Sequence, residues 1–283
     1  MGKVIVSGAA PQMTVPSTLP PIGTALNDMT WEQIRAISDA GKAADYFNLG
    51  DTKTITINGK VGNTTFSNLS IDAFIIGFNH NSAREGANRI HFQIGKINGT
   101  LVGLVDGNYG NNTSTTGAFT MNTSYTNSGG WNNSHMRKTV LGSNSTSATS
   151  PAANTLLAAL PADLRAVMKP ATKYSDNTGG GSDKASYVTS TTDLLPLLSE
   201  FEYHGARTYA NSAEKDYQAQ YDYYKAGNSN VHYKHNATGT AVNAWCRSVY
   251  SDYTGAFCLV RTNGGSNNNG ANRSWALAPC FFV

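Results

Sequence analysis

Apolar residues recur at helical spacing in the segment TWEQIRAISDAGKAADYF. Trp31, Ile34 and Ile37 fall three residues apart, which places them on one face of a helix. Thr30 and Gln33 have the spacing of a capping box, and a glycine follows the last apolar position. The pattern therefore predicts an amphipathic helix that begins after Thr30 and ends near that glycine.

Three later segments also predict helices. In NTLLAALPADLRAVM (154–168) the leucines share one face, and Pro161 should begin a new turn. GGWNNSHMRKTVL (129–141) and the tyrosine-rich SAEKDYQAQYDYYKAG (212–227) complete the set. DLLPLLSEFEYHG, which lies between them, is apolar enough to be buried.

Other stretches alternate or run apolar over strand lengths. In TKTITING, Ile55 and Ile57 alternate with polar residues, which predicts a half-buried strand. IDAFIIGF, RIHFQIGKI and LVGLVDG follow as a meander, separated by turn residues. AWCRSVY, AFCLVRT and SWALAPCFFV should be the last strands, with residues 274–283 as a buried strand of the sheet.

The segments between these elements divide the chain. Residues 1–27 contain a short strand, VIVSG, and the Pro-rich PSTLPPIG, an arm for virion attachment or oligomerisation. Residues 108–130 predict a long irregular loop, and no linker follows residue 27. We therefore expect an α+β fold with one domain at 28–283, whose binding segment lies at about 243–275.

The composition narrows the function. Only 14% of the 283 residues are charged, whereas 29 are Asn and 28 are Gly, which favours a neutral, amide-rich surface. A net charge of +3 without any basic run argues against nucleic acid as a partner. No apolar run reaches the length of a membrane helix, and the N-terminus does not resemble a signal peptide.

Candidate catalytic and metal-binding residues have ordinary alternatives. His80 and His91 lack a partner at metal-binding spacing, so hydrogen-bonded loop or strand histidines are favoured. Glu200 and Glu202 alternate as in a strand, which suits a solvated or salt-bridged face better than a carboxylate pair. Ser248 has no nucleophile-elbow motif around it. We therefore predict no catalytic residue, metal or cofactor.

The three cysteines, Cys246, Cys258 and Cys280, all fall in the predicted final strands. Their odd number predicts neither a disulfide framework nor a metal site, so buried or incidental thiols are the default.

Several segments occur in an order that resembles a family of phage and prophage structural proteins of gut Firmicutes. These are GGWNNSHMR, LPADLRAVMKPATKY, LLPLLSEFE, WCRS and WALAPCFFV, and the segment TWEQIRAISDAGKAADYFNLGDTKTI is similar to the family's opening. The resemblance covers residues 25–283. It implies a C-type lectin-like fold in the C-terminal part, shared with formylglycine-generating enzymes and with variable proteins of diversity-generating retroelements. Neither the calcium-site triplets of lectins nor the paired active-site cysteines of those enzymes are present.

The retroelement resemblance implies a test of composition. Adenine-directed mutation of Asn codons cannot produce Lys, Glu, Gln, Met or Trp. The tail 243–283 contains no Lys, Glu, Gln or Met, whereas the preceding 242 residues contain 28 of them. Burial of the last strands explains part of this gap, but it does not explain the polar YSDYTG and SNNNGANRS. We therefore favour diversification. We expect the asparagine-rich stretch around Asn267–Asn269 to be a loop that displays variable side chains.

This interpretation assigns two groups of residues. Trp245, Arg247 and Trp275 are expected to be fixed scaffold. The candidate ligand-binding, variable positions are Asn243, Ala244, Cys246, Tyr250, Ser251, Asp252, Tyr253, Asn267, Asn268, Asn269, Asn272 and Arg273.

Three functions follow. The first is a receptor-recognition protein on a phage tail or capsid surface, or on a bacterial cell surface if the gene is prophage-derived. It would bind a bacterial surface protein or glycan, contact other virion proteins and form a homo-oligomer such as a trimer. The second is a decoration protein without a receptor. The third, an enzyme of the formylglycine-generating type, is the least favoured.

Overall fold

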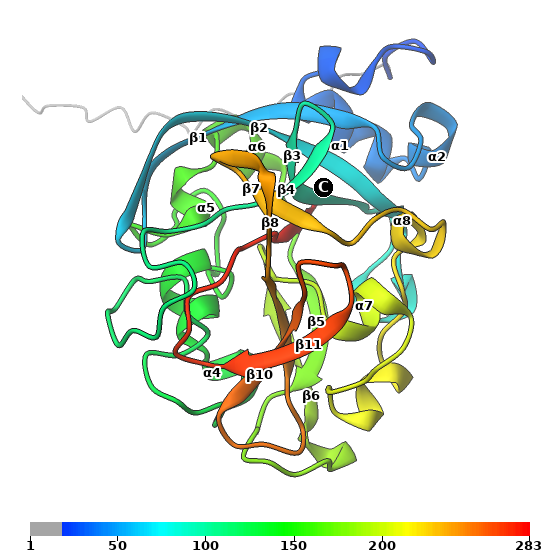
Figure 1. The fold of residues 1–283 in the computed structure, drawn as a ribbon. Coiled ribbons are helices and arrows are strands. Elements are labelled where there is room, and N and C mark those ends of the chain that lie inside the picture. Colours follow the sequence, from blue (N-terminus) through cyan, green and yellow to red (C-terminus); the bar gives the residue numbers. More distant parts are fainter. Residues whose placement is uncertain (1–18) are drawn as a thin grey trace, which may run out of the picture.

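A computed structural model describes residues 19–283 and has a mixed α+β architecture. Figure 1 shows the long strands of one sheet across the top of the view, with two smaller sheets below and helices on both sides. The predicted strand VIVSG lies outside the described residues. The helices are η1 (Leu26–Asp28), α1 (Trp31–Asp39), α2 (Ala43–Tyr46), α3 (Ser82–Glu85), α4 (Gly130–Asn133), the π-helix η2 (Met136–Leu141), α5 (Leu156–Ala159), α6 (Ala162–Val167), η3 (Ala185–Tyr187), α7 (Glu200–His204), η4 (Ser212–Asp216) and α8 (Asp222–Lys225).

The large sheet has the order β1-β2-β3-β4-β7-β8, and β12 also pairs with β3. Its first four strands form an antiparallel meander, as the alternation predicts, and β4 then pairs with β7 in parallel. The strands of this sheet are β1 (Thr52–Val61), β2 (Thr64–Phe78), β3 (Ile90–Ile97), β4 (Thr100–Gly103), β7 (His232–Lys234), β8 (Ala237–Val242) and β12 (Cys280–Phe282).

Two smaller antiparallel sheets lie beside it. One has the order β11-β10-β9, so β11 is an edge strand, and the other is the pair β5-β6. Their strands are β5 (Ala171–Asp176), β6 (Val188–Asp193), β9 (Ala244–Val249), β10 (Ala256–Val260) and β11 (Ser266–Gly270).

The predicted first helix is confirmed with its cap. Thr30 accepts a hydrogen bond from the Gln33 backbone and the Gln33 side chain accepts one from the Thr30 backbone. The apolar face is buried, and the Trp31 ring meets the rings of Phe92 and Phe281 edge-on at 5.5 and 5.8 Å. The helix thus packs on the middle of the large sheet.

The end of the chain is buried, but most of it is not a strand. All residues from Ser274 to Val283 are buried, whereas only Cys280–Phe282 pair as β12, with β3. The preceding residues make isolated bridges at Ala276 and Leu277. The prediction of a strand over 274–283 was therefore correct on burial and wrong on extent, because Pro279 has no amide N–H for a continuous ladder.

Three predicted helices are shorter or interrupted. The segment 154–168 divides into α5 and α6 at Pro161, as expected from its missing N–H. The segment 129–141 becomes α4 followed by a π-helix, and 212–227 becomes η4 and α8 with non-helical residues between them. Short polar helices of this kind are fixed by tertiary contacts rather than by propensity. No helix of residues 19–283 has the length and apolarity that would let it cross a membrane.

Candidate functional site

Four tyrosines form a chain of contacting rings on the surface around the turn between β9 and β10. Tyr253, at the turn, is 46% exposed, and Tyr125 is 56% exposed. Their ring centroids lie 6.1 Å apart, and the Tyr253 and Tyr250 centroids lie 6.3 Å apart. Tyr209 meets the half-buried Tyr250 edge-on at 5.4 Å. We call Tyr125, Tyr209, Tyr250 and Tyr253 the tyrosine face.

Two glycines let Tyr125 lie flat against the sheet. A Cβ at Gly255 would stand 2.6 Å from Cε1 of Tyr125, and a Cβ at Gly270 would also overlap the ring. Gly255 precedes β10 and Gly270 ends β11, so the Tyr125 ring covers the end of that strand pair. Its position is therefore fixed by the absence of two side chains.

Asn127 holds the turn from the inside. Its side chain is fully buried, and its Nδ2 atom lies within hydrogen-bonding distance of the carbonyl oxygens of Tyr250, Tyr253 and Ala256, at 3.2, 2.6 and 3.0 Å. Its Oδ1 atom accepts a hydrogen bond from the Gly180 backbone at 2.9 Å. The turn that carries Tyr253 is thus anchored to the core through one buried side chain.

The asparagine-rich stretch is an edge strand and not the loop that we predicted. Its five residues pair with β10 in unbroken antiparallel register, with Asn268 opposite Cys258. Regular pairing with β10 outweighs the low strand propensity of Asn. Alternation along β11 places Asn268 on the same side of the sheet as Ser266 and Gly270. Since Ser266 bonds Glu200 and Gly270 underlies Tyr125, Asn268 lies on the side of the tyrosine face.

The structure brings four of the twelve predicted binding positions to one face, namely Tyr250, Asp252, Tyr253 and Asn268, whereas Asn267 and Asn269 point to the other side of β11. Asp252 and Tyr253 are exposed on the β9–β10 turn, Tyr250 is half-buried beside them, and Asn267–Asn269 are half-buried in β11. Asn243 lies at the opposite end of β9, where its Oδ1 accepts from the Thr262 backbone at 3.2 Å.

Asn272 and Arg273 lie beyond the end of β11 and face another segment. They contact the loop around residue 112: the Asn272 carbonyl accepts from Thr113, and Arg273 binds the Asn112 side chain at 3.1 Å. These two residues therefore hold that loop in place.

Three predicted variable positions are buried, and for these the prediction was wrong. Ala244 and Cys246 have no exposed area within β9, and Ser251 is 1% exposed because its backbone and hydroxyl bond the Tyr209 carbonyl. A side chain at these positions cannot reach a ligand. The error came from choosing positions by the residue types that Asn codons can reach, which carries no information on burial, whereas both faces of β9 are covered.

Burial also accounts for most of the missing residue types in the tail. Of the 41 residues from Asn243 to Val283, 25 are buried. Lys, Glu and Gln are rarely fully buried, so their absence from these positions needs no mutational mechanism. The composition therefore supports diversification only at the few exposed positions.

The three predicted scaffold residues are all buried. Trp245 is 1% exposed, and its Nε1 donates to the Phe119 carbonyl at 3.1 Å. Trp275 is 8% exposed and meets the Tyr109 ring edge-on at 5.2 Å. Arg247 is fully buried and belongs to an ion-pair network.

That network contains two carboxylates and two basic side chains, all buried. Lys173 Nζ lies 2.5 Å from Glu85 Oε2 and 3.0 Å from Glu202 Oε1, and Arg247 binds both oxygens of Glu202. Burial raises the pKa of Glu85 to about 6, against the opposing charge of Lys173. Burial would also raise the pKa of Glu202, but Arg247 and Lys173 hold it below its usual range.

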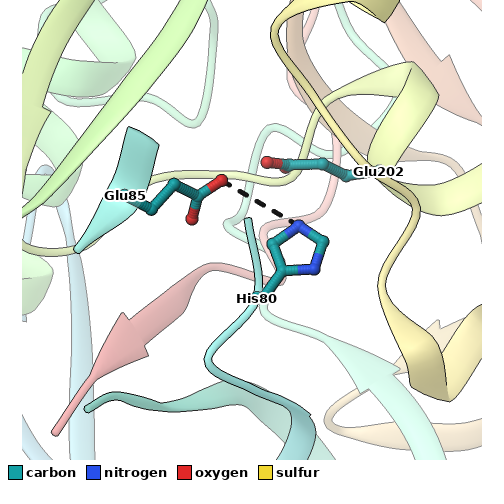
Figure 2. Close-up of side chains that lie close together, drawn as sticks. All are labelled: His80, Glu85 and Glu202. Atoms are coloured by element: carbon teal, nitrogen blue, oxygen red, sulfur yellow. Dashed lines mark ion pairs between the residues drawn. The ribbon is translucent and has the colours of Figure 1, made fainter. Parts of the chain in front are cut away.

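His80 joins these carboxylates in a group with metal-ligand chemistry. Figure 2 shows the His80 ring directed toward Glu85, with Nε2 and Oε1 3.9 Å apart. One ligand atom from each of His80, Glu85 and Glu202 lies within 4.8 Å of the others. A divalent cation would nevertheless add charge where Lys173 and Arg247 already balance both carboxylates. The group therefore does not fit a metal ion, and we interpret it as a structural network.

Other candidate groups are likewise enclosed by hydrogen bonds. Ser248 donates to Glu214 at 2.6 Å and accepts from the Glu200 backbone. Burial raises the pKa of Glu214 to about 7. Burial also raises the pKa values of the Cys246 and Cys258 thiols well above the usual range, which keeps both thiols protonated and unreactive.

Part of the buried network could have been predicted from a local sequence pattern. Ser199 and Glu202 form a capping box, so Glu200 and Glu202 lie on helix α7 rather than on the strand that we predicted. Lys173, Tyr125 and Asn127 carried no local signal, because their partners are distant in sequence.

Comparisons with known proteins give one family and no named relative. Neither the curated proteins nor the solved structures include a match to this chain. One family model, described as Domain of unknown function (DUF6273), matches residues 111–283, which include the whole tyrosine face and β11. Because that match spans more than half of the sequence, the chain belongs to the DUF6273 family.

Proposed function

We propose that this protein binds a ligand through the tyrosine face and the adjoining side of β11. The observation that carries the proposal is the exposure of Tyr253 on a turn whose carbonyl groups buried Asn127 contacts, with the exposed ring of Tyr125 beside it. Neighbouring exposed aromatic rings are typical of binding surfaces, and binding is therefore the use that we propose for them.

The chemistry of this surface suits recognition. Tyrosine offers a large contact area with few rotatable bonds, and Asn and Ser adapt their hydrogen bonds to a partner. Because Asn127 fixes the turn beforehand, binding would cost little ordering entropy. Asp252 is the charged residue of the β9–β10 turn, so a ligand with a basic group at this end of the surface would be complementary.

We further propose that the protein acts on a phage or prophage particle, on a C-type lectin-like scaffold, and recognises a bacterial surface protein or glycan. The support is the order of segments that resembles such structural proteins, together with the mixed α+β architecture. Under this proposal the variable positions are reduced to Tyr250, Asp252, Tyr253 and Asn268.

Binding of the purified protein to a panel of intact gut Firmicutes cells tests the proposal. Replacing Tyr125 and Tyr253 together with Ser should reduce cell binding about tenfold or more, because truncated aromatic anchors commonly cost 2 kcal/mol. The matched control replaces Ile22 and Leu49 with Ser, since these are exposed apolar side chains outside the face, and should bind as before. Equal binding by both double variants would refute the proposal.

Sequencing the same locus in a phage population separates diversified display from plain decoration. Display predicts variation concentrated at the four remaining codons, with Ala244, Cys246 and Ser251 constant. Uniform drift across the exposed residues would instead support a decoration protein.

A further inference from the structure

The outer edge of β11 carries backbone groups without a strand partner. The Arg261 amide bonds the Gly265 carbonyl and the Ala271 amide bonds the Gly255 carbonyl, which fixes the phase of the β10–β11 ladder. Antiparallel pairing alternates, so Asn267 and Asn269 direct their backbone groups toward β10. Ser266, Asn268 and Gly270 direct theirs away from it.

In two of these three residues the outward backbone amide and carbonyl groups have no hydrogen-bond partner in the described part of the chain. The Gly270 amide is bonded by Asn269 Oδ1 at 2.8 Å, and its carbonyl accepts from the Arg273 amide. Within residues 19–283, no backbone hydrogen bond beyond the β10 ladder involves Ser266 or Asn268. The edge thus offers two donors and two acceptors at the two-residue repeat of an extended chain.

This edge also lacks the features by which proteins prevent strand addition. Between Ser266 and Gly270 there is no lysine, no proline and no bulge. In Figure 1, β11 lies at the front of the molecule with no other element drawn over it. A regular, uncharged edge of this kind is suited to pairing with another chain.

Charges at the two ends of the β10–β11 pair indicate the direction of such a chain. Arg261 follows β10 next to the start of β11, and Asp252 lies on the turn near its end. Both are exposed, and neither forms an ion pair within the described part of the chain. An added antiparallel strand would run from the Asp252 end to the Arg261 end, so a basic N-terminal side and an acidic C-terminal side complement it.

We infer that β11 binds an extended peptide segment of the partner as an additional antiparallel strand beside the tyrosine face. This inference rests on the proposed function and narrows its ligand to protein. Main-chain hydrogen bonds to Ser266 and Asn268 would provide affinity, and alternate side chains would meet Tyr125. A glycan has no matching alternation of donors and acceptors.

Proline at position 268 tests the inference. The Asn268 amide points away from β10, so Asn268→Pro removes an outward donor and leaves the ladder with β10 complete. Asn268→Ala removes the side chain and keeps both outward backbone groups of the strand edge. The probes are an array of capped nine-residue peptides, including sequences with Lys at the N-terminal side and Glu at the C-terminal side, and an array of neutral glycans.

Both variants lose the Asn268 side chain, so the difference between them isolates the outward backbone donor. We expect Asn268→Pro to retain the same peptides about fivefold less than Asn268→Ala, since one hydrogen bond is worth about 1 kcal/mol. Amide hydrogen exchange of the wild type provides a second measurement that needs no variant. Bound peptide should slow exchange at Ser266 and Asn268.

The experiments distinguish a failure of strand addition at β11 from a failure of ligand binding at the tyrosine face. Binding of glycans alone, no retained peptide, or unchanged exchange at Ser266 and Asn268 would overturn strand addition. The tyrosine double variant would still lose cell binding if only this inference were wrong.

Discussion

The side-chain amide of Asn127 lies 2.6 Å from the carbonyl oxygen of Tyr253, although the two residues are 126 positions apart. Through this hydrogen bond a buried residue of the 108–130 loop determines the position of an exposed ring on the β9–β10 turn. The affinity of the tyrosine face should therefore depend on a residue that never contacts the ligand.

Replacing Asn127 with Ala tests this dependence. The change leaves the Tyr253 carbonyl without its donor, whereas the Tyr250 and Ala256 carbonyls each keep a backbone amide donor. It should reduce the free energy of unfolding by about 1–3 kcal/mol. Cell binding should fall further than stability explains, because the turn loses its fixed position. Asn133→Ala, at an exposed position, should change stability by less than about 0.5 kcal/mol. Normal binding by a destabilised Asn127→Ala would show that the turn needs no anchor.

Substitution of Lys173 should reduce the free energy of unfolding more than substitution of any other residue of the buried ion-pair network. Lys173→Met leaves Glu85 and Glu202 with a single basic partner, Arg247, and should cost about 3–5 kcal/mol in chemical denaturation. Adding Glu85→Gln in the same chain should recover part of that loss by removing the unpaired charge. The control is Lys215→Met, which removes an exposed lysine. If the single and double variants were equally stable, the charge balance that we describe would be wrong.

Glu214 predicts a defined contribution to the pH dependence of stability. Burial raises its pKa from 4.5 to about 7, so the folded state binds a proton that the unfolded state releases. The resulting stabilisation is fully present below pH 4.5 and is lost as the pH rises through 7. The difference in stability between wild type and Glu214→Gln should therefore change by about 3 kcal/mol between pH 4.5 and pH 8.

Denaturant titrations at several pH values measure that difference. Ser212→Ala, a change in the same helix η4 that removes no titratable group, should show no comparable dependence between pH 4.5 and pH 8. A constant difference between wild type and Glu214→Gln would mean that Glu214 titrates in the folded protein as it does in the unfolded chain.

Two aromatic residues near β9 should respond in opposite ways. Trp245 is 1% exposed and Tyr253 is 46% exposed. Trp245→Ala should reduce the free energy of unfolding by about 3–5 kcal/mol through the cavity that it leaves. Tyr253→Ala should change it by about 0.5 kcal/mol or less and should weaken cell binding. Thermal melts of the two variants check the stability changes, and a large loss from Tyr253→Ala would place that ring in the core.

The sequence was sufficient for elements whose signals are local. The capping box at Thr30 and Gln33, the alternation around Ile55 and the break at Pro161 all act within a few residues, and the structure agrees with each. The extent of β12 and the strand character of β11 depend on partners that are distant in the chain, and there the predictions were wrong.

The candidate site was only half predictable for the same reason. Tyr250, Asp252 and Tyr253 lie on a turn that polar residues mark in the sequence. The burial of Cys246 depends on helix α7 and β10, and the contribution of Tyr125 depends on the two glycines beneath it. Neither the burial of Cys246 nor the contribution of Tyr125 produces a sequence pattern within a single strand or turn.

Oxidative footprinting of the protein bound to cells tests the central claim most directly. Hydroxyl radicals modify exposed tyrosines, and mass spectrometry measures the modification of each residue with and without cells. The account predicts that Tyr125 and Tyr253 become protected on binding, while exposed Leu49 is modified to the same extent in both samples. Unchanged modification of both tyrosines in protein that is demonstrably bound would contradict the assignment of this surface.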